Sequence, residues 1–359
     1  MRRQNRFLAG LFLSEILCFG ISWAGDNVWT SSGPYEGKRD VWIAALVLDP
    51  SVPTTVYAGT TEGVYKSLDG GVTWAEASVG LTSSAVAALA VDPGATQTVY
   101  AGTDYGGGVF KSVDGGVSWT AANNGLPDAT DKRNIDALIV DPSTPQTVYA
   151  GTWDGVYKSM DGGASWVAIN NGMVNCCWSE NLHVYAMAMD PSAPQTIYAG
   201  GSGGAYKSVD GGENWTRITG NLSNPSFFGL MVDPRAGQIV YAIADNAAWP
   251  FRSPDGGVTW VPGEDRGFPQ SRTVAVSPST PQAVYAGTTD GVYRSVDGGK
   301  TWAAFNDDEH HDIVSLAVSP TTPQTLYAGT TDGRVYMITL TGPTVVGTQT
   351  WGEVKDQIR

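Results

Sequence analysis

Short apolar runs recur along almost the whole chain, and each run is bounded by a turn that contains proline or glycine. Residues 137–159 show the pattern clearly: one run ends at Asp141-Pro142, a second surrounds Tyr149, and a third follows Gly155. Short runs rich in β-branched and aromatic residues, with Pro and Gly between them, are typical of β-strands. The pattern therefore predicts an all-β fold.

The apolar pattern has a regular period, which is set by an Asp-Pro or Ser-Pro pair after the first run of each repeat. Successive prolines of these pairs are 42 to 49 residues apart, which matches four-stranded propeller blades. In the first repeat we expect strands at 44–48, 55–59, 63–66 and 73–76. The sequence thus predicts a seven-bladed β-propeller of four-stranded antiparallel blades. The seven prolines are Pro50, Pro93, Pro142, Pro191, Pro234, Pro278 and Pro320.

A second motif marks the turn between the third and fourth strands of six repeats. It contains a small hydroxyl residue, an Asp two places on, two glycines, and a Trp five places after the Asp. The glycines can adopt positive φ and the Asp can accept amide hydrogen bonds, as a tight hairpin requires. We call these segments the box loops. Their carboxylates are Asp69, Asp114, Asp161, Asp210, Asp255 and Asp297.

The box loops, for example Ser295-Val-Asp-Gly-Gly-Lys-Thr-Trp302, resemble the Asp-box of BNR-type β-propellers. That group includes sialidases, two-domain xyloglucanases, sortilin-type receptor ectodomains and photosystem assembly propellers. The resemblance covers nearly the whole mature chain and implies the propeller fold. It implies no single function, because the box occurs in catalytic and non-catalytic members alike. We expect the six carboxylates to be structural, since a catalyst is needed once or twice and not six times.

Seven tyrosines occupy equivalent positions in the expected second strands. A residue that recurs in every blade is best explained by packing between neighbouring sheets, and the same holds for the tryptophans of the box loops. The tyrosines are Tyr57, Tyr100, Tyr149, Tyr198, Tyr241, Tyr285 and Tyr327.

The seventh repeat never reaches a box loop, so its outer strand must come from elsewhere in the chain. Residues 27–30 are the favoured donor, because Trp29 precedes Pro50 by a distance similar to that between each box Trp and the following Pro. An N-terminal strand would then close the ring and remove exposed sheet edges. Residues 348–351 of the tail are the competing donor.

The chain divides into a leader at 1–24, a propeller at 25–340 and a C-terminal tail at 341–359. The leader has a basic start, an apolar run and a small-x-small site at Ser22-Trp23-Ala24, which is typical of a secretory signal peptide. We therefore expect a secreted or periplasmic protein. The alternative is an uncleaved anchor, because Glu15 interrupts the apolar run. No later segment is apolar for long enough to span a bilayer.

The mature chain is strongly acidic. Without residues 1–24, which carry Arg2, Arg3, Arg6 and Glu15, the formal charge changes from −14 to −16. Such a charge opposes phosphate backbones and anionic lipid, so nucleic acid and membrane surfaces are not expected as partners. The adjacent Cys176 and Cys177 are either free or paired with each other, since export permits oxidation and adjacency strains the disulfide.

Antiparallel blades place the Asp-Pro corners and the box loops on one face, which we call the box face. The turns between second and third strands and the connections between blades share the other face, which we call the variable face. Individual residues occur there, so we expect function there. Aromatic rings on these loops predict a recognition surface, although they could instead fill the end of the central channel. The candidate binding residues are Trp42, Tyr105, Trp153, Trp178, His183 and Trp249.

One acidic segment, 307–312, holds two of the three histidines. Its imidazoles and carboxylates would suit a weakly bound divalent cation, with His310, His311 and Asp312 as candidate ligands. A solvated charged loop is the simpler interpretation, because consecutive residues seldom converge on one ion. No other cofactor is expected.

These observations favour an exported, non-catalytic binding or scaffolding module for a protein or carbohydrate partner. The alternative is a glycoside hydrolase that uses two carboxylates on the variable face. A sialidase is disfavoured, because the chain lacks the family's Arg-Ile-Pro element and its acidity would repel an anionic sugar. The sequence indicates no oligomeric state.

Overall fold

The computed structural model describes residues 28–35, 40–130, 132–174, 182–222, 225–245, 247–263, 268–279, 283–306, 310–321 and 324–340. One compact unit spans Val28–Gly342. Its described residues form seven separate sheets of four strands, and every paired strand runs antiparallel to its neighbour. None of the described segments forms a helix long and apolar enough to cross a membrane.

The first four blades each use four consecutive strands. Blade one contains β2 (Ile43–Leu48), β3 (Val56–Thr60), β4 (Gly63–Ser67) and β5 (Ala75–Glu76). Blade two contains β6 (Val86–Val91), β7 (Val99–Thr103), β8 (Gly108–Ser112) and β9 (Thr120–Ala121). Blade three contains β10 (Ile135–Val140), β11 (Val148–Thr152), β12 (Gly155–Ser159) and β13 (Val167–Ala168). Blade four contains β14 (Val184–Met189), β15 (Ile197–Gly201), β16 (Gly204–Ser208) and β17 (Thr216–Arg217).

Blades five and six also use four consecutive strands, whereas blade seven takes its outer strand from the start of the chain. Blade five contains β18 (Phe227–Val232), β19 (Val240–Ala244), β20 (Phe251–Ser253) and β21 (Val261–Pro262). Blade six contains β22 (Ser271–Val276), β23 (Val284–Thr288), β24 (Gly291–Ser295) and β25 (Ala303–Ala304). Blade seven contains β26 (Ile313–Val318), β27 (Gln324–Thr330), β28 (Val335–Leu340) and, from the start of the chain, β1 (Thr30–Ser32).

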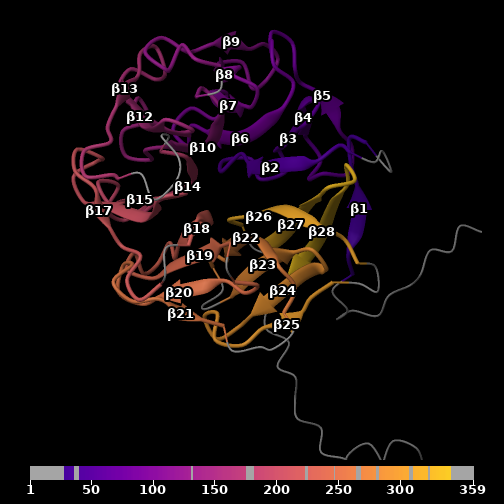
Figure 1. The fold of residues 1–359 in the computed structure, drawn as a ribbon. Helices are drawn as coiled ribbons and strands as arrows, with labels where there is room; N and C mark the ends of the chain where they lie inside the picture. Colours follow the sequence, from indigo (N-terminus) through magenta and orange to yellow (C-terminus); the bar gives the residue numbers. More distant parts are fainter. Residues whose placement is uncertain are drawn as a thin grey trace, which may run out of the picture. The chain divides into compact units, whose positions relative to one another are not determined.

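The blades stand in a ring with their first strands innermost (Figure 1). Each inner strand contacts the inner strands of both neighbouring blades, and this series is unbroken from β2 to β26 and back. The second strands of the first six blades are buried along their whole length, because neighbouring sheets cover both faces. The expected seven-bladed, four-stranded all-β architecture is therefore confirmed.

The repeated tyrosines bind one blade to the next. Tyr57 in blade one is fully buried, and its hydroxyl donates to the carbonyl of Gly115 in the box loop of blade two, at 3.2 Å. The Lys66 ammonium donates to the same carbonyl at 2.8 Å and lies 5.1 Å from the Tyr57 ring centroid. The same pairing of tyrosine and lysine recurs at the next two joints. Packing between sheets, the expected role of these tyrosines, is confirmed.

The box loops are held by a serine and an aspartate with different surroundings. In blade three the buried Ser159 hydroxyl donates to Asp161 Oδ1 at 2.7 Å and accepts the Gly163 amide at 2.8 Å. The Asp161 carboxylate is exposed and accepts the Ser165 hydroxyl and amide. These hydrogen bonds, above all that from the Ser165 hydroxyl, lower the pKa of Asp161 to about 2. The carboxylate thus closes its own loop, as a structural residue does.

The box tryptophans form a second bond across the blade joints. The Trp166 indole donates to the carbonyl of Ala122 at 2.8 Å, and Ala122 lies three residues after the Trp of the preceding blade. The same hydrogen bond, to the carbonyl three residues after the preceding blade's Trp, is made by the indoles of Trp119, Trp215 and Trp260.

The N-terminal segment reproduces this bond at the closing joint. Trp29 donates to the carbonyl of Phe305 at 2.7 Å, and Phe305 lies three residues after the Trp of blade six. Strand β1 pairs with β28 from Thr30 opposite Met337 to Ser32 opposite Val335. Closure by the N-terminal strand is therefore confirmed, and the competing segment 348–351 lies outside the described residues.

Replacing Trp29 with alanine should destabilise the propeller as much as replacing a box tryptophan. We expect Trp29→Ala to lower the free energy of unfolding by on the order of 3 kcal/mol, with Trp166→Ala as the matched control. Chemical denaturation of both variants measures this. A stability of Trp29→Ala equal to that of the wild-type chain would show that the N-terminal segment does not hold the ring closed.

Candidate functional site

Every inner strand begins with a β-bulge near the variable face. In β2 the pairing with β3 shifts between Ile43 and Ala45, so that Ala44 has no partner of its own, and the other inner strands show the same shift. Bulges of this kind change the direction of a side chain and are common next to functional sites. The seven bulged residues are Ala44, Ala87, Asp136, Tyr185, Phe228, Arg272 and Val314.

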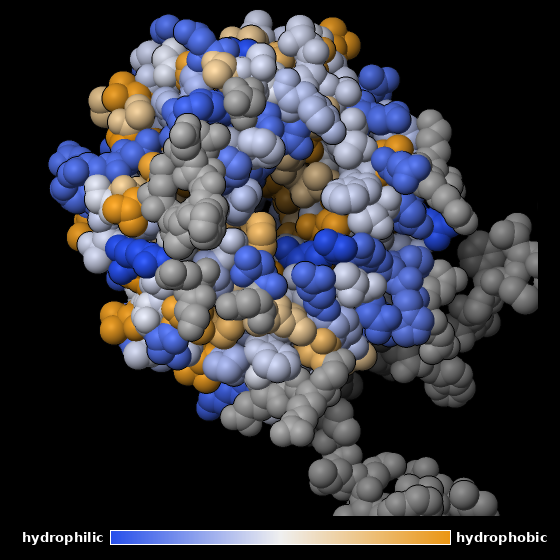
Figure 2. Space-filling view, viewed as in Figure 1, coloured by the Kyte–Doolittle hydropathy of each residue, from blue (hydrophilic) through white to orange (hydrophobic). Residues whose placement is uncertain are grey.

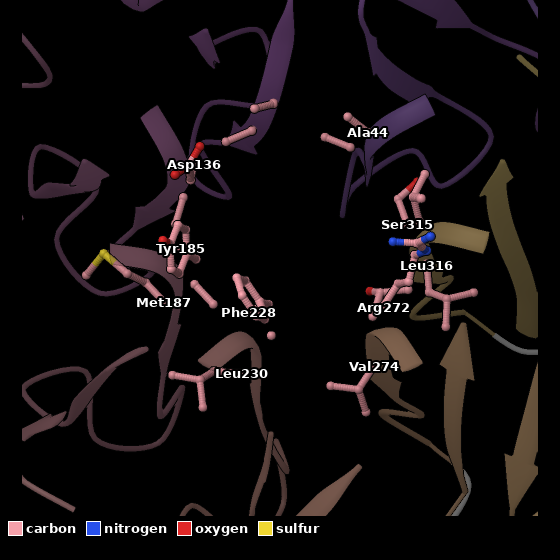
Figure 3. Close-up of a pocket in the computed structure, with 18 of the residues that line it drawn as sticks. Ala44, Asp136, Tyr185, Met187, Phe228, Leu230, Arg272, Val274, Ser315 and Leu316 are labelled. Atoms are coloured by element: carbon pink, nitrogen blue, oxygen red, sulfur yellow. The ribbon is translucent and has the colours of Figure 1, made fainter. Parts of the chain in front are cut away.

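All seven bulged residues line a single open cavity at the centre of the ring, with a volume of about 290 Å³. We call this cavity the channel mouth. Figure 2 shows the hollow, with hydrophobic atoms inside and hydrophilic atoms on part of its rim. The seven side chains differ in size: those of Ala44, Ala87 and Val314 are small and leave space, whereas the other four are large, polar or charged. In Figure 3, Asp136, Tyr185 and Phe228 lie opposite Arg272.

Four rings form a continuous aromatic arc beside the channel mouth: Trp153, His183, Tyr185 and Phe228. Trp153 stacks on His183 with ring centroids 4.7 Å apart, and His183 meets Tyr185 edge to face at 5.9 Å. Tyr185 in turn lies 4.9 Å from Phe228, whose side chain is 45% exposed. The arc crosses blades three, four and five and ends in solvent, so it can offer ring faces to a ligand.

Asp136 joins the aromatic arc through its carboxyl group. The Trp153 indole donates to Asp136 Oδ2 at 2.8 Å. Burial raises the pKa of Asp136 to about 7, the nearby negative charge of Asp104 adds to this effect, and the Trp153 hydrogen bond opposes it. Burial also raises the pKa of Asp104. The channel mouth thus contains an acidic group that titrates near neutral pH.

Arg272 on the opposite side is already paired. Its guanidinium forms two hydrogen bonds with Asp312, from Nε to Oδ1 at 2.6 Å and from Nη2 to Oδ2 at 3.0 Å. This bidentate geometry fixes the side chain and cancels its charge. The only basic side chain that lines the described channel mouth therefore adds no net positive charge.

The predicted binding residues are only partly brought together. Trp153 and His183 adjoin the channel mouth, whereas Tyr105 and Trp42 stand on the variable face, 85% and 47% exposed. Trp249 is partly buried and packs against the core cluster around Phe268 and Trp302. Trp178, Cys176 and Cys177 lie outside the described residues.

The candidate metal ligands contact three different partners. His310 Nδ1 lies 2.6 Å from Asp290 Oδ1, His311 Nε2 lies 2.6 Å from the Tyr336 hydroxyl, and Asp312 holds Arg272. In the part of the chain that the structure describes, no three His, Cys, Asp or Glu side chains converge on one point. Residues 307–309 lie outside that part.

Sequence reasoning missed Asp136 and Tyr185, because both lie inside expected strands and not in loops. A signal was nevertheless present. The positions equivalent to Asp136 and Tyr185 are Ala44 and Ala87 in blades one and two, and Val314 in blade seven. An Asp and a Tyr at a position that is small and apolar in three other blades mark individual residues in a repeated strand.

Neither a protein-family model nor a curated protein sequence matches the chain. Among solved structures, an ancestral GH74 enzyme aligns at 22% identity and a TM-score of 0.69, covering 85% of this chain and 45% of that one. The GH74 xyloglucanase from Xanthomonas campestris aligns at 20% identity and 0.67, covering 86% and 53%. YCF48 bound to D1 peptide aligns at 16% identity and 0.64, covering 87% and 97%.

The chain thus spans about half the length of the two GH74 structures it matches and nearly all of YCF48. At these identities the likeness shows the propeller fold alone. The site has to be interpreted from its own geometry.

Replacing Asp136 with asparagine should remove a pH-dependent term from the stability. The folded pKa of about 7 lies above the ordinary value of 3.8, so the wild-type chain should lose stability as the pH rises from 4 to above 7. The loss should be on the order of 4 kcal/mol and absent from Asp136→Asn. Urea denaturation at several pH values measures the difference between the two chains. A difference that does not change with pH would contradict the burial of this carboxyl group.

Proposed function

We propose that this chain is an exported member of the Asp-box propeller group that binds a protein or carbohydrate partner at the channel mouth, without catalysing a reaction. Export rests on the leader predicted at 1–24. Membership of the group rests on the box loops, whose hydrogen bonds repeat from blade to blade. The site itself rests on one observation: a bulge in every blade directs one side chain to the channel mouth, and these side chains differ.

The distribution of exposed aromatic rings supports recognition on the variable face. Among the described residues, the exposed large aromatic side chains are those of Trp42, Tyr105 and Phe228, and all three belong to that face. The exposed apolar residues of the box loops are aliphatic, such as Leu68 and Met160. Aromatic residues are enriched where proteins bind partners, because they supply a large contact area at low entropic cost.

The position of Tyr105 supports the same conclusion. This residue has a φ of 55°, which is unfavourable for a tyrosine, and yet its side chain is 85% exposed. The turn around it is fixed, because Asn134 accepts the Gly106 amide at 2.8 Å and Arg133 donates to the Gly106 carbonyl at 2.8 Å. A strained conformation that serves no packing is typical of a binding residue held in place in advance.

A second candidate function is hydrolysis of a neutral glycan. It is favoured by one observation: Asp136 has a pKa raised to about 7 beside a second carboxylate, Asp104, as a general acid and its partner would have. Release of reducing ends from neutral polysaccharides, lost in Asp136→Asn, would establish hydrolysis. Binding of the same polysaccharide without turnover would favour the binding module.

Truncating the two rings of the aromatic arc that line the channel mouth should weaken binding without unfolding the chain. We expect Tyr185→Ala and Phe228→Ala each to reduce affinity by roughly 30-fold, for a partner isolated from the exported fraction or a glycan selected on an array. Leu68→Ala, on the exposed rim of the box face, is the matched control and should leave affinity unchanged. Loss of affinity in Leu68→Ala alone would show that the partner binds the box face and not the channel mouth.

A further inference from the structure

Asp136 at the channel mouth and Asp104 near it have no cationic partner among the described residues. Neither Asp104 nor Asp136 lies within ion-pair distance of a Lys, Arg or His side chain. Each is partly buried, and the two repel each other. Removing charged carboxylates from water without a counter-charge is costly, so this region favours the arrival of a positive group.

The basic side chains nearby are already engaged elsewhere. Lys132 and Arg133 immediately precede β10, the strand that contains Asp136. Lys132 pairs with Asp154 at 3.0 Å, and Arg133 donates to the Gly106 carbonyl at 2.8 Å. Arg272 across the channel is held by Asp312. Burial lowers the pKa of His183, so its ring is neutral at pH 7. The missing positive charge therefore has to come from outside the described chain.

The walls beside these carboxylates suit a cation in particular. Trp153, Tyr185 and Phe228 present aromatic rings along one side, and the faces of such rings attract Lys and Arg side chains. The alanines on the opposite side leave the cavity open, and its volume of about 290 Å³ can admit one long side chain. A net charge of −14 over the whole chain draws cations toward it over long distances.

We propose that the channel mouth receives a basic side chain, arginine or lysine, from a polypeptide partner, with Asp136 as its counter-charge and the aromatic arc as its apolar wall. This inference rests on the proposed binding function and specifies the chemistry of the bound group. An anionic ligand would meet the carboxylate of Asp136, with a second negative charge, Asp104, nearby. A neutral sugar could stack on the rings but would leave the carboxylates unpaired.

The proposal implies that affinity increases with pH. Charged Asp136 binds a cation better than neutral Asp136, so affinity should rise up to the pKa of this group and level off above it. The groups that face Asp136 are Asp104 from the turn after β7, Trp153 from the turn after β11, and Tyr185 from β14. The two ring systems stay uncharged over this range, so the rise reports mainly on the two carboxylates.

The test uses the full chain and three capped peptides, Ac-Gly-X-Gly-NH2, in which X is arginine, lysine or citrulline. Citrulline keeps the shape of arginine and removes its charge. The indole N–H of Trp153, which donates to Asp136, provides a local NMR signal that Trp153→Phe identifies. We expect the arginine and lysine peptides to shift this signal and to bind at least about tenfold more tightly than the citrulline peptide at pH 8.

Two variants separate the site from general attraction to an acidic protein. Asp136→Asn should abolish both the preference for arginine over citrulline and its increase with pH. Asp290→Asn removes one carboxylate from the same face, in blade six, and should leave the preference intact. Equal binding of all three peptides, or no binding of any, would overturn the proposal. If Tyr185→Ala still weakened binding of the isolated partner in that case, the proposed function would stand and only the cationic group would be wrong.

Discussion

Hydrogen bonds that cross the joints between blades are the interactions on which the rest of the structure depends. A tyrosine hydroxyl of one blade and a box tryptophan of the next donate to carbonyls on the opposite side of the joint. Since each blade is held by both neighbours, one open joint would expose a buried sheet. Trp29 makes the last of these bonds, from a segment that lies 276 residues away from its acceptor along the chain. Strand β1 near the start of the chain therefore completes the blade that β26, β27 and β28 form near its end.

The same residue type has opposite properties on the two faces, because its surroundings differ. Asp161 is exposed and receives hydrogen bonds that lower its pKa, so it stays charged and closes a loop. Asp136 is partly buried near another carboxylate, and its pKa rises to about 7. Six copies of the first arrangement build the scaffold, whereas the second occurs at a single bulge. This contrast separates structural carboxylates from a carboxylate that a ligand can reach.

Repetition explains which features the sequence could predict. The strands, the inter-blade tyrosines and the closure by Trp29 follow from a pattern that recurs seven times. An assignment made in one blade is therefore supported by the equivalent residues of the other blades. The channel mouth depends on Asp136, Tyr185, Phe228 and Arg272, which occur once each. Comparison with the other blades marks some of these residues as individual, but their convergence follows from the β-bulges and the ring. Trp249 shows the converse: this aromatic residue on an expected loop is partly buried and packs against the core cluster around Phe268 and Trp302.

The central claim is that partners bind at the channel mouth and not on the box face. A photo-crosslinking amino acid placed at Phe228 or at Leu68 tests this in the cell that produces the protein, since both side chains are exposed. We expect a discrete covalent adduct from the probe at Phe228, abolished by Asp136→Asn, and none from the probe at Leu68. An adduct from Leu68 with none from Phe228 would contradict it.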